Sequence, residues 1–173
     1  MVEPDAKAVQ ILREMRTLET QRSTWEKHWQ EVADYIVPRK ADITKKRTAG
    51  EKRTQLIFDG TAIHALELLS SSLHGMLTSA STRWFTLGFS DPALNQEDAA
   101  KEWLEAATDS LYDAFDRSNF QEQVQELYQD LVAFGTACMF VEARDPTGLR
   151  FSTRHISEIF VTDDKDGRVD QVY

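Results

Sequence analysis

Residues 120–143 read FQEQVQELYQDLVAFGTACMFVEA, and the spacing of the apolar side chains changes once within this stretch. Up to Phe134 they recur at steps of four and three, which is the repeat of one helix face. These residues are Phe120, Val124, Leu127, Leu131 and Phe134. Gly135 follows, and glycine commonly ends helices. Residues 137–143 are rich in strand formers. The stretch therefore predicts helical structure before Gly135 and β-structure after it.

Upstream of this stretch, two further helices are predicted over 60–78 and 96–117. The stripe of the first consists of Phe58, Ala62, Leu66, Leu69, Leu73 and Met76. Other leucines widen its apolar face, so we expect this helix to be buried on more than one side. Asp59 or Thr61 is expected to cap its start, and Asn95 with Asp98 the start of the next helix. Weak alternation over 84–89 predicts a short strand between them.

The N-terminal residues 5–37 predict one long helix, which Pro38 ends. Its stripe is Ile11, Met15, Leu18, Trp25, Trp29, Val32 and Ile36, and Arg22 stands where an apolar residue is expected. Two interpretations stay open: a core helix of its own domain, or a helix docked on another subunit, where Arg22 would meet an acidic group. For the second, the candidate subunit-packing residues are Trp25, Trp29, Val32 and Ile36.

After residue 143, strands are predicted over 149–153, 158–162 and 168–173, separated by turns at 145–148 and 163–167. A sheet that begins this late resembles part of a larger one. The sequence thus predicts an α+β fold, mainly helical, with about four helices followed by an incomplete antiparallel sheet. We divide it into residues 1–57 (long helix and basic loop), 58–135 (helices with a short strand) and 136–173 (start of a sheet).

Charge is unevenly distributed along the 173 residues, whose net charge is −9. This balance excludes a small basic DNA-binding module. One cysteine excludes an intramolecular disulfide framework, and no apolar run approaches the roughly 18 residues of a membrane span. We therefore expect a folded chain with no membrane partner.

Residues 39–53 form a basic loop, RKADITKKRTAGEKR, with seven cations against two carboxylates. The candidate contacts for a partner or DNA are Arg39, Lys40, Lys45, Lys46, Arg47, Lys52 and Arg53. Three interpretations stay open: a solvated loop, a contact with a neighbouring subunit or docking protein, or a DNA contact. Residues 91–130 carry 11 carboxylates against two cations, a face that could pair with such a basic surface.

We find no pattern of catalytic, cofactor-binding or metal-binding residues, so we expect a protein that is not an enzyme. A glycine-rich phosphate loop is missing from the sequence, and the four histidines lack zinc spacing. Ser70–Ser72 near His74 is the single hint of a hydrolase. These serines lie in mid-helix without a nucleophile elbow, where small residues serve helix packing.

Residues 57–87, IFDGTAIHALELLSSSLHGMLTSASTRWFTL, resemble the portal, or head-to-tail connecting, proteins of short-tailed bacteriophages. The resemblance rests on Asp59-Gly60-Thr61-Ala62, the helix from Ala65 to Leu73, Leu77-Thr78-Ser79 and the Trp84-Phe85 pair. Further blocks are Phe134 to Glu142 and the stretch LRFSTRHISEIFVTDDKDGRVDQVY. The long helix with two tryptophans before a Pro-Arg pair also fits, so the resemblance covers essentially the whole chain.

The resemblance implies a structural ring, usually a dodecamer, at one capsid vertex of the virion, made in the bacterial host cytoplasm. Double-stranded DNA passes through such a ring during packaging and ejection. Its partners are other copies of itself, the terminase, and capsid, tail or adaptor proteins. The match is to the N-terminal, wing-like part of the family's chains. A stand-alone nucleic-acid- or protein-binding module acting through residues 39–53 is the alternative.

Overall fold

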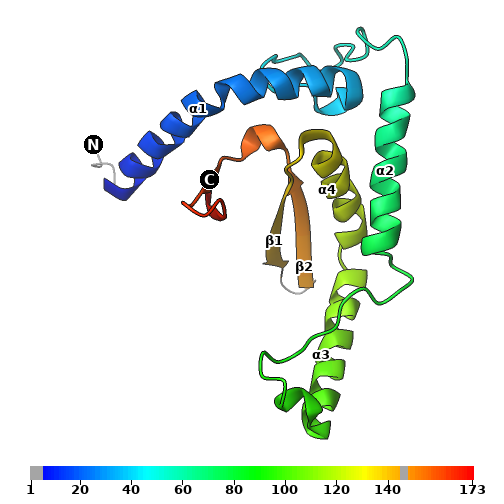
Figure 1. Cartoon of the computed structure of the whole chain (residues 1–173). Coiled ribbons are helices and arrows are strands. Elements are labelled where there is room, and N and C mark those ends of the chain that lie inside the picture. Colours follow the sequence, from blue (N-terminus) through cyan, green and yellow to red (C-terminus); the bar gives the residue numbers. More distant parts are fainter. Residues whose placement is uncertain (1–5, 145–147) are drawn as a thin grey trace. The chain divides into compact units, whose positions relative to one another are not determined.

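The computed structural model describes residues 6–144 and 148–173, which contain four α-helices and four strands (Figure 1). The helices are α1 (Ala6–Ile36), α2 (Thr61–Leu77), α3 (Asp98–Asp116) and α4 (Phe120–Phe134). The strands are β1 (Cys138–Arg144), β2 (Gly148–Arg154), β3 (Val161–Asp163) and β4 (Val169–Val172). Single 3-10 turns lie at Pro38–Lys40, Leu94–Gln96 and Ile156–Glu158. The mainly helical α+β class is confirmed.

The strands pair two by two: β1 with β2, and β3 with β4. In the second pair Val161 faces Val172 and Thr162 faces Gln171, and the register shifts at Asp163. The turn between β3 and β4 places Gly167 at a φ of +73°, a conformation that glycine adopts without strain. The turn predicted at 145–148 falls mostly on residues 145–147, outside the described residues.

The chain divides into two compact units, and the first comprises residues up to 66 together with 130–138 and 154–173. Its buried apolar residues include Ala33, Val37, Ile156 and Ile159. The N-terminal part of α1 is joined to the end of β4 by a hydrogen bond of 2.7 Å from the Tyr173 hydroxyl to Glu14 Oε2. The long helix thus packs on segments of its own chain.

The second unit comprises residues 67–129 and 139–153, and aromatic rings fill its core. Phe120, Val124, Tyr128 and Phe151 are buried there, with Phe115 packed against them. The ring centroids of Phe115 and Phe120 lie 4.7 Å apart, and those of Phe120 and Phe151 lie 5.1 Å apart. Of the apolar face predicted for α4, Phe120, Val124 and Leu127 belong to this core, whereas Leu131 is 42% exposed.

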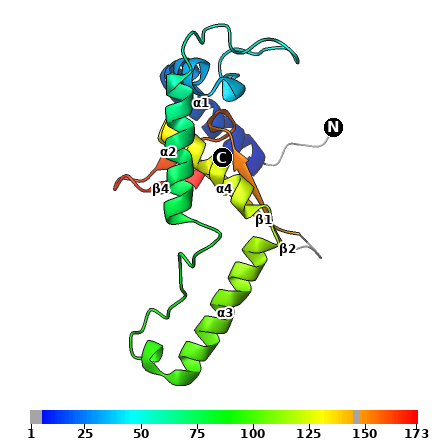
Figure 2. The same ribbon diagram turned by 90° about the vertical axis from the view of Figure 1, so that its right-hand side faces the viewer.

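The predicted strand over 84–89 is wrong, because this segment is extended but pairs with no strand. Figure 2 shows the chain running back beside α3 before that helix begins. The Tyr112 hydroxyl accepts hydrogen bonds from the amides of Trp84 (2.7 Å) and Phe85 (2.9 Å), and Thr108 Oγ1 accepts one from Leu87. Side chains of α3 satisfy the backbone groups that a partner strand would otherwise satisfy.

Asp59 caps the start of α2, as predicted, since its carboxylate accepts hydrogen bonds from the Thr61 amide and the Thr61 hydroxyl. The predicted cap of α3 is wrong: Glu97 occupies the cap position without a side-chain bond. Asn95 instead bonds the backbone of Phe89 in both directions. Gly135 follows α4 at a φ of +74°, which confirms the predicted helix end.

The expectation that α2 is buried on more than one side is wrong within the described chain. Leu66 and Ser70 are buried on one face, but Met76 is 81% exposed and Leu68 is 61% exposed. Phe58, which precedes the helix, is 95% exposed. These apolar side chains do not belong to the core of either unit.

Candidate functional site

Carboxylates of the same unit bind four of the seven cations in the basic loop. Lys40 Nζ lies 2.7 and 2.8 Å from the two carboxylate oxygens of Asp130. Lys45 and Arg47 both bind Asp34, at 2.6 and 2.9 Å. Arg53 binds Asp42 at 2.5 Å. These four cations therefore hold the loop in place, and the interpretation as a purely solvated loop does not fit them.

Gln30, a buried residue of α1, fixes the backbone of the basic loop. Its Nε2 donates to the Ala41 carbonyl at 2.7 Å and to Asp34 Oδ1 at 3.0 Å. Its Oε1 accepts the amides of Ile43 (3.1 Å), Thr44 (2.8 Å) and Lys45 (3.2 Å). The sequence analysis missed this residue. Its one signal is that Gln30 and Asp34 are polar residues four apart on the helix face next to the loop.

Asp34 and Asp42 remain ionised in this environment. Burial acts to raise the pKa of Asp34, but hydrogen bonds from Lys45 and Arg47 outweigh it and hold that pKa below its ordinary value. The hydrogen bond from Arg53 is the main cause that lowers the pKa of Asp42. Both carboxylates therefore stay charged and keep the loop bound near neutral pH.

The other three cations of the loop, Arg39, Lys46 and Lys52, are exposed. Within residues 6–144 and 148–173 their side chains make no hydrogen bond or ion pair. We call these three residues the outer cations. The structure thus separates the seven predicted contact residues into four that build the loop and three that face outward.

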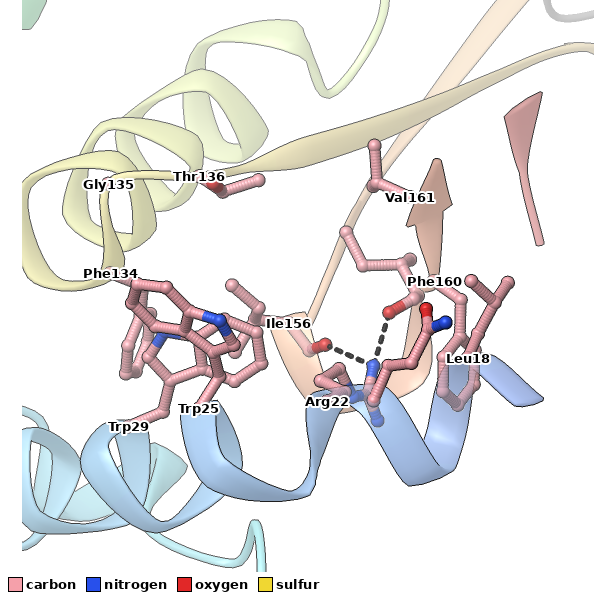
Figure 3. Close-up of a pocket in the computed structure, with 12 residues that line it drawn as sticks. Leu18, Arg22, Trp25, Trp29, Phe134, Gly135, Thr136, Ile156, Phe160 and Val161 are labelled. Carbon is pink, nitrogen blue, oxygen red and sulfur yellow. Dashed lines mark hydrogen bonds between the residues drawn. The ribbon is translucent and has the colours of Figure 1, made fainter. Parts of the chain in front are cut away.

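The predicted packing face of α1 borders a pocket of about 490 Å³, shown in Figure 3. Trp25 and Trp29 line it from the helix, and their ring centroids lie 6.3 Å apart. Trp25 is 60% exposed, whereas Trp29, Val32 and Ile36 are half-buried. The structure therefore brings the two tryptophans to one pocket and leaves the Trp25 ring mostly exposed.

Arg22 lies in the same pocket and binds groups of its own chain. Its guanidinium donates to the carbonyls of Ile156 (3.2 Å), Ser157 (3.0 Å) and Ile159, two of which are drawn in Figure 3. Its Nε donates to Glu26 at 2.9 Å, and its carbon Cζ lies 3.9 Å from the centroid of the Phe160 ring. Arg22 interrupts the apolar stripe because it caps the 3-10 turn at 156–158.

The serines that hinted at a hydrolase bond their own helix. Ser70 Oγ donates to the Glu67 carbonyl at 3.2 Å, and Ser72 Oγ donates to the Leu68 carbonyl at 2.7 Å. His74 Nδ1 lies 3.0 Å from Thr78 Oγ1. The described residues hold no group of three or more potential metal ligands, and none of their helices is long and apolar enough to span a membrane. These contacts give no basis for assigning a reaction.

A sequence model of the bacteriophage head to tail connecting protein family matches residues 8–173. The chain belongs to this family. It is 33% identical over 157 residues to a probable portal protein of Bordetella phage BPP-1, an alignment that covers 90% of this chain and 28% of that protein. It is 29% identical over 161 residues to the portal protein of Salmonella phage epsilon15, which covers 92% and 29% respectively.

The resemblance to head-to-tail connecting proteins is therefore confirmed for almost the whole chain. The chain spans less than a third of the length of these two portal proteins.

Proposed function

We propose that this chain forms a structural subunit, or the N-terminal part of one, of a portal ring at a capsid vertex. Double-stranded DNA enters and leaves the head through this ring, and the ring joins head to tail. The observation that carries the proposal is the family match over residues 8–173. In this proposal the chain acts in the virion, with other copies of itself, the terminase, and capsid, tail or adaptor proteins as partners.

A passive channel has physical requirements that this chain meets. Such a channel must let DNA slide, so it must not hold the phosphates tightly. The many exposed carboxylates of α3 repel phosphate, which supports a role at or near a conduit. Ring closure needs surfaces that pack on a neighbour, and the exposed Trp25, Phe58 and Met76 offer apolar area for such contacts.

The alternative, a stand-alone module that binds nucleic acid through residues 39–53, has less support. A binding surface of that kind needs many cations that are free to meet phosphates. Four of the seven cations in this loop bind Asp34, Asp42 or Asp130. Three outward-facing cations remain, which is a small surface for nucleic acid.

Immunogold labelling tests the proposed function. An antibody against this chain is applied to opened particles of the phage whose genome encodes it. We expect gold at one vertex of each particle, the vertex that carries the tail, and rings in negative-stain images of the purified complete gene product. Gold spread over the capsid, or particles without gold together with a product that forms no rings, would contradict the proposal.

A further inference from the structure

We infer that copies of this chain contact one another through the outer cations of one copy and an acidic stripe on α3 of the next. The inference rests on the proposed ring function and names a contact between its subunits. A closed ring needs two different, complementary faces on every copy, because one face of each subunit contacts the opposite face of the next subunit. The two faces of this contact lie in different parts of the same chain.

The acidic stripe runs the length of α3. Its members are Asp98, Glu102, Glu105, Asp109, Asp113 and Asp116, and all are exposed. Their spacings of four and three residues place all six within an arc of about 80° on the helix surface. The stripe is therefore a continuous row of negative charge and not a set of scattered carboxylates.

Three members of the stripe already have a cation beside them. Lys101 binds Asp98 at 3.3 Å, Arg117 binds Asp113 at 3.5 Å, and Arg83 binds Asp109. Within the described ranges, Glu102, Glu105 and Asp116 form no ion pair or side-chain hydrogen bond. The stripe thus retains three carboxylates to match the three outer cations.

The structure holds the outer cations on an ordered loop. Arg39 precedes Lys40, which is bound to the buried Asp130. Lys46 lies between Lys45 and Arg47, both bound to Asp34, and Lys52 precedes Arg53, which is bound to Asp42. Each outer cation therefore has a sequence neighbour that is anchored by an ion pair. Because the backbone of the loop is already held, binding costs little further conformational entropy of the loop.

A carboxylate surface fits the outer cations better than DNA does. The three outer cations of one copy would neutralise about three phosphates, which is a weak contact for a single copy. The chain as a whole has a net charge of −9, which repels a polyanion at long range. A second copy of the chain brings three unpaired carboxylates in one row, so the charges balance one to one.

Charge reversal with complementation tests this contact. The first variant, Arg39→Glu/Lys46→Glu/Lys52→Glu, makes the loop acidic, and the second, Glu102→Lys/Glu105→Lys/Asp116→Lys, makes the stripe basic. Sedimentation velocity measures self-association of the purified chain in about 0.05 M and about 0.5 M salt. We expect the wild type to associate at low salt, and each variant alone to bind itself about tenfold or more weakly, because its two faces now repel.

An equal mixture of the two variants is the decisive sample. The acidic loop of the first then meets the basic stripe of the second, and the two unchanged faces also match, so association returns to the wild-type level. A control variant, Arg13→Glu/Lys165→Glu/Arg168→Glu, makes the same change in net charge at exposed positions elsewhere. We expect the control to associate like the wild type.

Other results would overturn the contact. They are a wild type that stays monomeric at low salt, a mixture that does not recover, or a control that weakens as much as the first variant. Loss of duplex DNA binding in the first variant, with self-association unchanged, would assign the outer cations to DNA instead. The immunogold test is independent, so gold at the tail vertex combined with any of these results leaves the portal function standing without this contact.

Discussion

Lys40 Nζ bridges both carboxylate oxygens of Asp130, at 2.7 and 2.8 Å, and this pair ties the basic loop to the last turns of α4. The Asp130 side chain is 1% exposed and that of Lys40 is 17% exposed. A buried carboxylate is tolerated when a cation compensates it, and removing the cation leaves an uncompensated charge. Removing Lys40 should therefore lower the free energy of unfolding more than removing the charge of Asp130 does.

Lys40→Met is expected to destabilise the chain by about 3–5 kcal/mol, because it removes a cation that compensates the buried Asp130 carboxylate. Asp130→Asn should cost less, since the partly exposed Lys40 can turn to water. Urea unfolding followed by circular dichroism measures both free energies. If the two variants lost equal free energy of unfolding, or if Lys40→Met lost less, the prediction would be contradicted, because Lys40 would then not be compensating a buried Asp130 charge.

Gln30→Ala is expected to loosen the basic loop without unfolding the rest of the chain. The variant removes the acceptor of three loop amides and the donor to Ala41. Hydrogen exchange at residues 41–47 should become faster, and trypsin should cleave sooner after Lys45, Lys46 and Arg47. Gln21→Ala, at an exposed position of the same helix, is the matched control and should leave both rates unchanged.

The sequence predicts the helices well because apolar periodicity and turn residues determine them locally. Gly135 and Pro38 end helices for reasons of backbone geometry that no tertiary contact needs to supply. Residues 84–89 are extended because Tyr112 and Thr108 satisfy their amides, and a hydroxyl that will meet a distant amide has no sequence signature.

In the candidate site, too, contacts between residues far apart in the sequence could not be predicted. The positive charge of the basic loop is evident from the sequence, but its division into bound and outward-facing cations depends on Gln30, Asp34 and Asp130. These three residues resemble ordinary polar positions of helix faces. Arg22 shows the same difficulty, since its three carbonyl partners lie more than 130 residues away along the chain.

Tyr112→Phe is expected to destabilise the second unit by about 1 kcal/mol, because the amides of Trp84 and Phe85 lose a shared acceptor. The ring itself stays, so its contact with Phe85, at 4.6 Å between centroids, is preserved. Near-ultraviolet circular dichroism should report a more mobile Trp84. Tyr35→Phe, at an exposed position, is the control, and an equal loss there would contradict the role of the Tyr112 hydroxyl.

His155 gives the chain a pH dependence whose direction follows from burial. Burial is the main cause that lowers its pKa below the ordinary 6.5. The charge of Lys40 acts in the same direction, whereas the carboxylates of Asp130 and Glu158 and a hydrogen bond with the Lys40 backbone oppose them. His155 Nδ1 accepts the Ser157 amide at 3.2 Å, which requires the neutral ring. The unfolded chain therefore binds this proton more readily than the folded chain does.

The free energy of unfolding should consequently decrease as the pH falls below 6.5, and His155 should add no further decrease once the pH is below its folded pKa. The contribution of one such group is at most about 1.4 kcal/mol per pH unit.

In His155→Asn the amide oxygen can still accept the Ser157 amide, so the cap persists while the titration disappears. The free energy of unfolding should therefore change less between pH 7.5 and pH 5 in this variant than in the wild type. His28→Asn, at an exposed position of α1, is the control and should keep the wild-type dependence on pH. A wild-type slope retained in His155→Asn would mean that another group binds the proton, because the variant removes the ring while keeping its hydrogen bond.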